Sequence, residues 1–255
     1  MGLAFNDVEL SPINNGIQGA YGNGSTLGFA PISRIFAQNP TASNSFDIRL
    51  DRTGDLDETS TGSLLISEHD PDFSNITSQP RLPRQVDGRW VIQLDGISVN
   101  GQQAVFNASS ISTIPSGKLG MLMDTGFSFP PLPPALIDMI YGSIPGAVKF
   151  SDQLPQWIVP CDGTTNLTFT IGYVLYCEFI ISRVCLTEAL CCSGVDFPVH
   201  PLDLTFVSTT EVEINGSNQN VTFCYNTYQY FALNPVGFDF DGALGDAFLK
   251  NVYAS

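Results

Sequence analysis

A carboxyl group that could take part in acid–base chemistry stands at Asp124, where an apolar run ends. Residues 119–123 predict a buried strand, and Thr125 and Gly126 follow the aspartate directly. Burying an ionisable carboxyl group is unfavourable by several kcal/mol unless hydrogen bonds or a shared proton offset it. Gly126 permits a tight turn whose backbone N–H groups point at the carboxylate, and the Thr125 hydroxyl can reach a neighbouring loop. An ordinary aspartate turn can have the same three residues, so the surrounding elements must show whether Asp124 is catalytic.

Other residues with catalytic or metal-binding potential favour simpler interpretations. The histidines of the chain are His69 and His200, and His69 stands in a Glu-His-Asp-Pro-Asp sequence that suggests a metal site. Because no second histidine is suitably spaced, we expect a polar turn there and predict neither a metal nor a cofactor. A Ser-His-Asp hydrolase would need a Gly-x-Ser-x-Gly turn, which the sequence lacks.

Two groups of acidic residues away from Asp124 are interpreted as surface. Asp55, Asp57 and Glu58 lie in a Gly/Thr/Ser-rich stretch and predict a solvated loop. Asp239 and Asp241 could be mistaken for a catalytic partner of Asp124, but ordinary loop acidity explains them.

The elements that would position Asp124 are mainly strands. Runs rich in Val, Ile, Thr and Phe, separated by Gly, Pro, Asn and Asp, predict strands at 63–67, 90–94 and 167–171. Asn100-Gly101 predicts a type I′ hairpin turn, because both residues tolerate a positive φ. Apolar spacing predicts helices at 134–144 and 246–251, and a weak boundary falls at 79–88. The sequence therefore predicts an all-β fold with minor helices and long loops.

Charge and glycosylation signals bear on the binding partners and the localisation of the protein. Acidic residues outnumber basic ones by 25 to 10 among 255, which argues against binding nucleic acid or anionic lipid surfaces and suits an acidic environment. Repeated N-x-[ST] acceptors favour the secretory pathway, so we expect a secreted or vacuolar glycoprotein. The chain shows no leader of the secretory type, and we expect its true N-terminus to be absent. The acceptor asparagines are Asn23, Asn75, Asn107, Asn166, Asn215 and Asn220.

Residues 173–193 differ in composition from the rest of the chain. They contain no Gly, Pro, Asn or Asp, and they hold four of the six cysteines. Glu178, Arg183 and Glu188 interrupt the apolar run, which argues against a membrane span and leaves a buried helix as one alternative. The codons of this stretch can also encode splice donor, branch and acceptor sites, and its removal keeps the reading frame. We favour a retained intron of fungal type, which cDNA sequencing would test.

Without that stretch, Cys161 and Cys224 remain as a pair, and in an oxidising compartment the simplest prediction is a disulfide between them. The cysteines within 173–193 could instead be metal ligands, but no CxxC pair or nearby histidine supports that.

Several motifs in order along the chain resemble the pepsin-like aspartic endopeptidases. Asp124-Thr125-Gly126, with the following helix, is similar to the second catalytic loop of that family, and the loop at 65–73 is similar to fungal secreted or vacuolar members. Further matching stretches are Gly2–Phe5, Trp90–Gly101, Trp157–Asp162, Phe169–Gly172 and Leu244–Tyr253.

The resemblance implies a bilobal acid-protease fold, with residues 1–87 as the rear of the N-terminal lobe and 88–255 as a nearly complete C-terminal lobe. It implies that Asp124 is the second catalytic aspartate, that Thr125, Gly126 and Phe127 contact the substrate or the facing loop, and that Cys161–Cys224 is the disulfide of the C-terminal lobe. Phe127 departs from the Thr or Ser often found at its position, which puts one hydrogen bond to substrate in doubt.

No Asp-Thr-Gly or Asp-Ser-Gly precedes Asp124. The resemblance therefore predicts an endopeptidase acting on polypeptides, monomeric when full length, whose present sequence holds one aspartate of two and is inactive alone. The alternative from another class is a relative that keeps the fold as a non-catalytic binding or inhibitory module.

Overall fold

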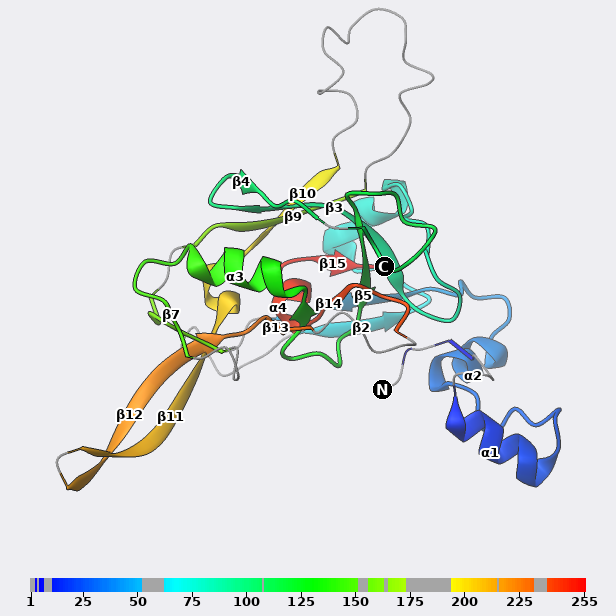
Figure 1. The fold of residues 1–255 in the computed structure, drawn as a ribbon. Helices are drawn as coiled ribbons and strands as arrows, with labels where there is room; N and C mark the ends of the chain where they lie inside the picture. The colour runs from blue at the N-terminus through cyan, green and yellow to red at the C-terminus, as the bar shows by residue number, and fades with distance from the viewer. Residues whose placement is uncertain are drawn as a thin grey trace, which may run out of the picture.

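The computed structural model describes residues 3, 5–6, 11–51, 62–106, 108–150, 156–162, 165–172, 194–214, 216–231 and 238–255. Strands dominate and helices are short, so the all-β prediction is confirmed (Figure 1). Among the described residues, no helix is both long and apolar enough to span a bilayer. The proposed intron at 173–193 and the acidic group at 55–58 lie outside the described residues.

A mixed sheet forms the centre of the molecule and carries the strand that leads to Asp124. Its order is β10-β9-β3-β5-β14, with β4 paired to β3; β14 runs parallel to β5, and the other pairs are antiparallel. The bounds are β3 Val91–Val99, β4 Gln102–Gln103, β5 Leu119–Met123, β9 Leu167–Ile171, β10 Val195–Val199 and β14 Gly242–Leu244.

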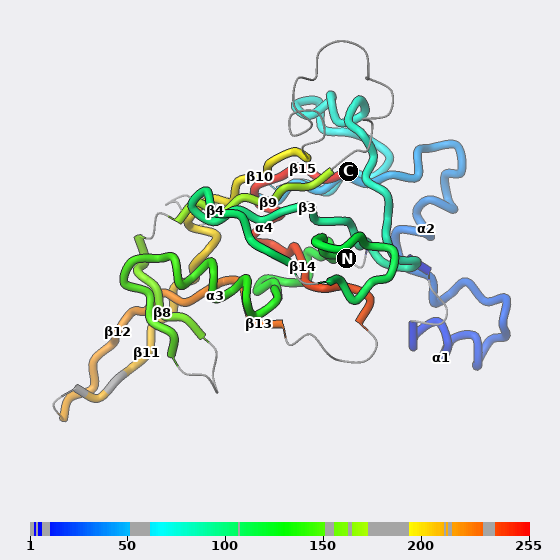
Figure 2. The backbone as a smooth tube through the Cα atoms, turned by 45° about the horizontal axis from the view of Figure 1, so that its top comes forward, coloured from blue at the N-terminus to red at the C-terminus, as the bar shows by residue number. Residues whose placement is uncertain are grey.

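Three smaller sheets surround the central one (Figures 1 and 2). A three-stranded sheet pairs two strands from the first third of the chain with the last strand, in the order β15-β1-β2. Its bounds are β1 Phe46–Arg49, β2 Ser63–Ile66 and β15 Tyr253–Ala254. A four-stranded sheet has the order β11-β12-β8-β7, with β7 Val148–Lys149, β8 Trp157–Val159, β11 Thr205–Ile214 and β12 Ser217–Asn226. The third is the parallel pair β6 Pro131–Leu132 and β13 Gln229–Tyr230.

The helices of the described chain are few and short. Their bounds are α1 Pro12–Tyr21, α2 Pro31–Gln38, α3 Pro134–Gly142 and α4 Asp246–Leu249, with 3₁₀ turns η1 Pro71–Ser78 and η3 Pro201–Leu204. α3 buries Leu136, Ile137, Ile140 and Tyr141 in the main core. The Tyr141 hydroxyl donates to Leu204 O at 2.8 Å, and burial raises its pKa well above the ordinary value.

Local sequence signals match most of these elements. The helix expected at 134–144 is α3, and the one expected at 246–251 is α4. Asn100 and Gly101 have φ values of 50° and 80°, as the predicted type I′ turn requires, and Val99 faces Gln102 across it.

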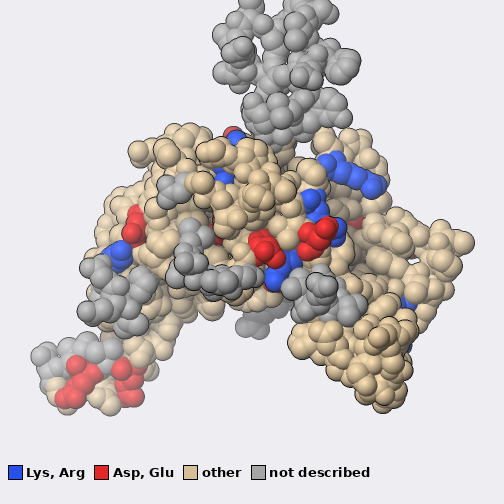
Figure 3. Space-filling model, turned by 45° about the vertical axis from the view of Figure 1, so that its right-hand side comes forward, with Lys and Arg blue, Asp and Glu red and all other residues tan. Residues whose placement is uncertain are grey.

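Two parts of the fold were not predicted. α1 and α2 lie away from the central sheet, and the β11–β12 hairpin projects from the body (Figures 1 and 2). Acidic side chains gather at the far end of this hairpin, where Glu211 and Glu213 are exposed (Figure 3). Ser11 caps α1 by accepting from Asn14 N, and Pro12 begins the helix; this Ser-Pro pair was the available signal for it.

Candidate active site

Asp124 lies immediately after β5, between two neighbouring strands. β3 pairs with β5 on one side, and β14 pairs with it on the other, so that Leu244 faces Met123. The Asp124 N–H donates to Leu244 O at 3.2 Å, which extends this pairing by one residue. Asp124 is half-buried. The central sheet therefore holds the aspartate at a fixed position at its rim.

The loop after Asp124 folds back onto the carboxylate. The Gly126 N–H donates to Asp124 Oδ1 at 2.8 Å, and the Phe127 N–H donates to Asp124 O at 3.2 Å. Thr125 and Gly126 are exposed, and Phe127 is half-buried. This is the tight turn that the sequence predicted at Gly126.

The chain around Gly245 supports this loop from behind. Asp246 N–H donates to Phe127 O at 3.0 Å, and the Ser128 hydroxyl donates to Asp246 Oδ2 at 3.1 Å. A Cβ at Gly245 would lie 2.1 Å from Phe127 O, closer than any real contact, so only glycine fits. Residues 244–246 thus pack directly against the candidate loop.

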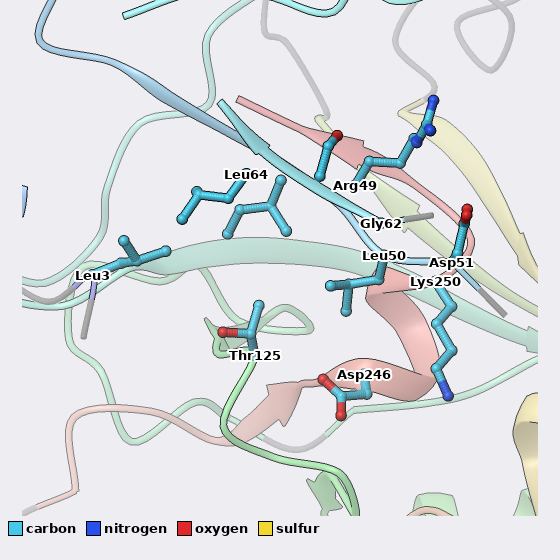
Figure 4. A pocket seen from close by; sticks show the side chains of 11 residues that line it. Leu3, Arg49, Leu50, Asp51, Gly62, Leu64, Thr125, Asp246 and Lys250 are labelled. Atoms are coloured by element: carbon cyan, nitrogen blue, oxygen red, sulfur yellow. The ribbon is translucent and has the colours of Figure 1, made fainter. Parts of the chain in front are cut away.

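A cavity of about 490 Å³ opens beside this loop (Figure 4). Thr125 and Asp246 border it on one side, and Leu50 and Leu64 border it on the other (Figure 4). Its remaining lining comes from Leu3, Ile48, Arg49, Asp51, Gly62, Ser63 and Lys250. A smaller hollow of about 250 Å³ is lined by Ser128, Phe129, Leu202, Asp203, Thr205, Phe206, Thr227, Asp246, Ala247 and Lys250.

Asp241 differs from its sequence interpretation. It is 1% exposed, and its carboxylate accepts from Gly120 N at 2.8 Å and from three donors of Ser109 and Ser110. Loop acidity is therefore the wrong description of Asp241, because it is a buried anchor between β14 and the start of β5. Asp239 has a half-exposed side chain that lies 3.9 Å from Arg89 Nε.

Each histidine contacts a protein group rather than a second histidine in the described residues. His69 Nδ1 lies 2.7 Å from the buried Asp47 Oδ2, and His200 Nδ1 accepts from Leu202 N at 3.2 Å. No cluster of potential metal ligands occurs within the described ranges.

Asp124, Thr125, Gly126 and Phe127 come together in one loop, as the sequence implies. No hydrogen bond within the described part of the chain joins Asp124 to a second carboxyl group. Cys161 and Cys224 form a disulfide that ties β8 to β12. The acceptors Asn23, Asn75, Asn166 and Asn220 are exposed, whereas Asn107 and Asn215 lie outside the described residues.

Comparison with known proteins places the chain in a family. The model of the eukaryotic aspartyl protease family matches residues 1–255. The chain belongs to the eukaryotic aspartyl protease family. Its fold is accordingly the pepsin-like all-β fold expected from the motifs. The chain is also 28% identical over 225 residues to a protein of Arthroderma otae (strain ATCC MYA-4605 / CBS 113480) that is named as a probable aspartic-type endopeptidase CTSD. That match covers 88% of this chain and 46% of the relative, so the chain spans about half the relative's length.

Proposed function

We propose that this chain carries one of the two catalytic carboxyl groups of an aspartic-type endopeptidase, and that Asp124 is that group. The observation that carries the proposal is the geometry at the end of β5, where Gly126 N–H donates to Asp124 Oδ1 at 2.8 Å. Membership of the aspartyl protease family over the whole chain supports the same assignment.

The chemistry follows from two carboxyl groups that share one proton. Two carboxylates about 3 Å apart cannot both ionise, so one acts as a base and the other stays protonated. The base takes a proton from a water molecule that attacks the scissile carbonyl carbon, and the acid later protonates the leaving amine. Asp124 would be one of the pair, Thr125 would bond to the facing loop, and Gly126 and Phe127 would contact the peptide.

The chain by itself is proposed to have no peptidase activity. Residues 1–123 contain neither Asp-Thr-Gly nor Asp-Ser-Gly, and a single carboxyl group has no acid–base partner. The working enzyme would take its second aspartate from polypeptide beyond this sequence, with residues 1–87 and 88–255 in different lobes. It would act on polypeptides, as a monomer, in a secreted or vacuolar setting.

The experiment compares this chain with a form extended at its N-terminus by the natural upstream sequence, on a quenched-fluorescence peptide in acid. We expect no cleavage by the chain alone and cleavage by the extended form. Asp124→Asn should lower kcat of the extended form by about 10³-fold or more, whereas Asp162→Asn, at an exposed carboxylate, should leave it unchanged.

Two outcomes would contradict the proposal. Full activity in the extended Asp124→Asn variant would remove Asp124 from the chemistry. An upstream sequence without an Asp-Thr-Gly or Asp-Ser-Gly loop, together with no cleavage and no binding of a pepstatin-type inhibitor, would favour the non-catalytic binding module.

A further inference from the structure

A second carboxylate with unusual surroundings, Asp47, lies in the three-stranded sheet. Asp47 belongs to β1, between β2 and β15, and it is 1% exposed. A buried carboxyl group is unfavourable unless its oxygens accept hydrogen bonds. The contacts of Asp47 therefore show which elements depend on its charge.

Two side chains from different parts of the chain meet on one oxygen of Asp47. His69 Nδ1 lies 2.7 Å from Asp47 Oδ2, and the Tyr253 hydroxyl donates to the same oxygen. His69 stands three residues after the end of β2, and Tyr253 is the first residue of β15. An imidazole can donate from Nδ1 in its neutral or its charged form, so this contact does not depend on the charge of His69.

The Tyr253 ring is held from its other sides as well. Its oxygen accepts from Asp70 N at 2.9 Å, and Phe73 stacks on the ring at 4.4 Å between centroids. Burial and the contact with Asp47 raise the pKa of Tyr253, so the phenol keeps the proton that it donates. The position of Tyr253 is thus set by Asp47 of β1 and by the segment from Asp70 to Phe73.

These contacts matter because β15 is very short. It pairs with β1 only through Ile48 opposite Ala254 and Arg49 opposite Tyr253. Two such pairs at the edge of a sheet form a weak ladder. β15 also follows α4 closely, and α4 begins at Asp246, whose N–H donates to the candidate active loop.

We propose that Asp47, His69 and Tyr253 form a proton-dependent clasp that keeps β15 on β1 in mildly acidic solution and releases it when Asp47 takes up a proton. This Asp47 clasp does not depend on the proposed peptidase function. An ionised Oδ2 can accept from both donors, whereas a protonated carboxyl group loses the charge that makes both hydrogen bonds strong.

The direction of the pH effect follows from the surroundings of Asp47. Burial acts to raise its pKa, but hydrogen bonds with Ser255, Tyr253 and His69 together lower the pKa below its ordinary value. A carboxyl group with a lowered pKa contributes stability that is present above its unfolded pKa and lost as pH falls through its folded pKa. The clasp therefore holds through mild acid and opens only below the usual range for aspartate.

Two charged residues of the described chain flank this group: Arg49 lies two positions after Asp47 on β1, and Asp70 follows His69 directly. Arg49 and Asp70 form an ion pair with each other at 3.1 Å. Across the sheet, β2 places the apolar Leu65 opposite Asp47. His69 and Tyr253 are thus the groups whose hydrogen bonds with Asp47 Oδ2 respond to the proton on Asp47.

Hydrogen exchange of the backbone amides measures the clasp directly. The amides of Ile48, Tyr253 and Ala254 are followed by mass spectrometry from about pH 6 to pH 2.5, with rates corrected for intrinsic exchange. Wild-type protection should stay constant down to about pH 4 and then fall by about tenfold or more. Asp47→Asn, which imitates the uncharged group, should show the reduced protection at every pH.

Two further variants keep the test decisive if Asp47→Asn does not fold. Tyr253→Phe removes one donor, so the folded pKa of Asp47 should rise toward its ordinary value; protection above about pH 4 should then be lower than in the wild type, and its fall in acid should be smaller and complete at a higher pH. Asp72→Asn alters an exposed carboxylate on η1 and should leave the wild-type profile intact.

The inference would be overturned if Tyr253→Phe kept the wild-type profile or if Asp72→Asn changed it. It would also be overturned if protection at β15 fell only together with protection in β3, because that pattern reports global unfolding. Wild-type protection in a folded Asp47→Asn variant would have the same effect.

Discussion

Deletion of residues 173–193 should stabilise the protein, because the strands on either side are already in hairpin register. β9 and β10 pair with Ile171 opposite Val195, so Gly172 and Gly194 are the residues next to the pair on each side. Gly172 has φ of 87°, in the left-handed region that a two-residue hairpin turn uses. The shortened chain would connect the strands by Gly172-Gly194, one of the sequences such a turn prefers.

The size of the effect can be worked from the length of the connection. The cost of closing a loop grows as three halves of RT times the logarithm of its length. Shortening the connection from about 23 residues to 2 therefore favours folding by about 2 kcal/mol. The strands themselves keep their pairing, since the ladder from Leu167–Val199 to Ile171–Val195 stays complete.

Urea unfolding, followed by circular dichroism with the Cys161–Cys224 disulfide intact, gives the free energy of unfolding of both chains. In the shortened chain, Gly172→Val should remove about 1–3 kcal/mol, because a β-branched residue is strained at positive φ. The reasoning would be refuted if the deletion lowered the free energy of unfolding, since residues 173–193 would then contribute contacts that the fold needs. A mature transcript that retains their codons would refute the intron hypothesis separately.

Two further substitutions test how the loop of Asp124 is supported. Asp241→Ala should lower the free energy of unfolding by roughly 3–5 kcal/mol, because the buried donors of Gly120, Ser109 and Ser110 lose a charged acceptor. In the same urea titration, Asp239→Ala should change the free energy of unfolding by less than about 1 kcal/mol, because the Asp239 side chain is half-exposed. Similar effects of the two variants would contradict the anchoring role of Asp241. Gly245→Ala should lower the melting temperature, because the new methyl group forces Phe127 O away at a cost of about 1–3 kcal/mol in the free energy of unfolding. Gly24→Ala, whose methyl group would meet no atom within 4 Å, should leave the melting temperature unchanged. An unchanged melting temperature in Gly245→Ala would show that the loop can move to accommodate the methyl group.

The candidate site was predictable where its features are local in sequence. The strand before Asp124, the turn at Gly126 and the helix α3 follow from apolar runs, a glycine and a periodic face within a few residues. The type I′ turn at Asn100 was predictable for the same reason, because the φ values it needs are a property of the two residues themselves. The order of such local motifs also indicated the family.

Only the tertiary structure decided which charged side chains are buried and what they contact. Asp241 and Asp239 look alike in the sequence, but the donors that bury Asp241 come from residues more than 120 positions away. Asp47 lies 206 positions from Tyr253 and 22 from His69, so no local pattern joins them. The sequence alone thus determined the fold class and the turn that holds Asp124. Burial and pairing of distant charges were decided by packing, because they depend on which surfaces the folded sheets bring together.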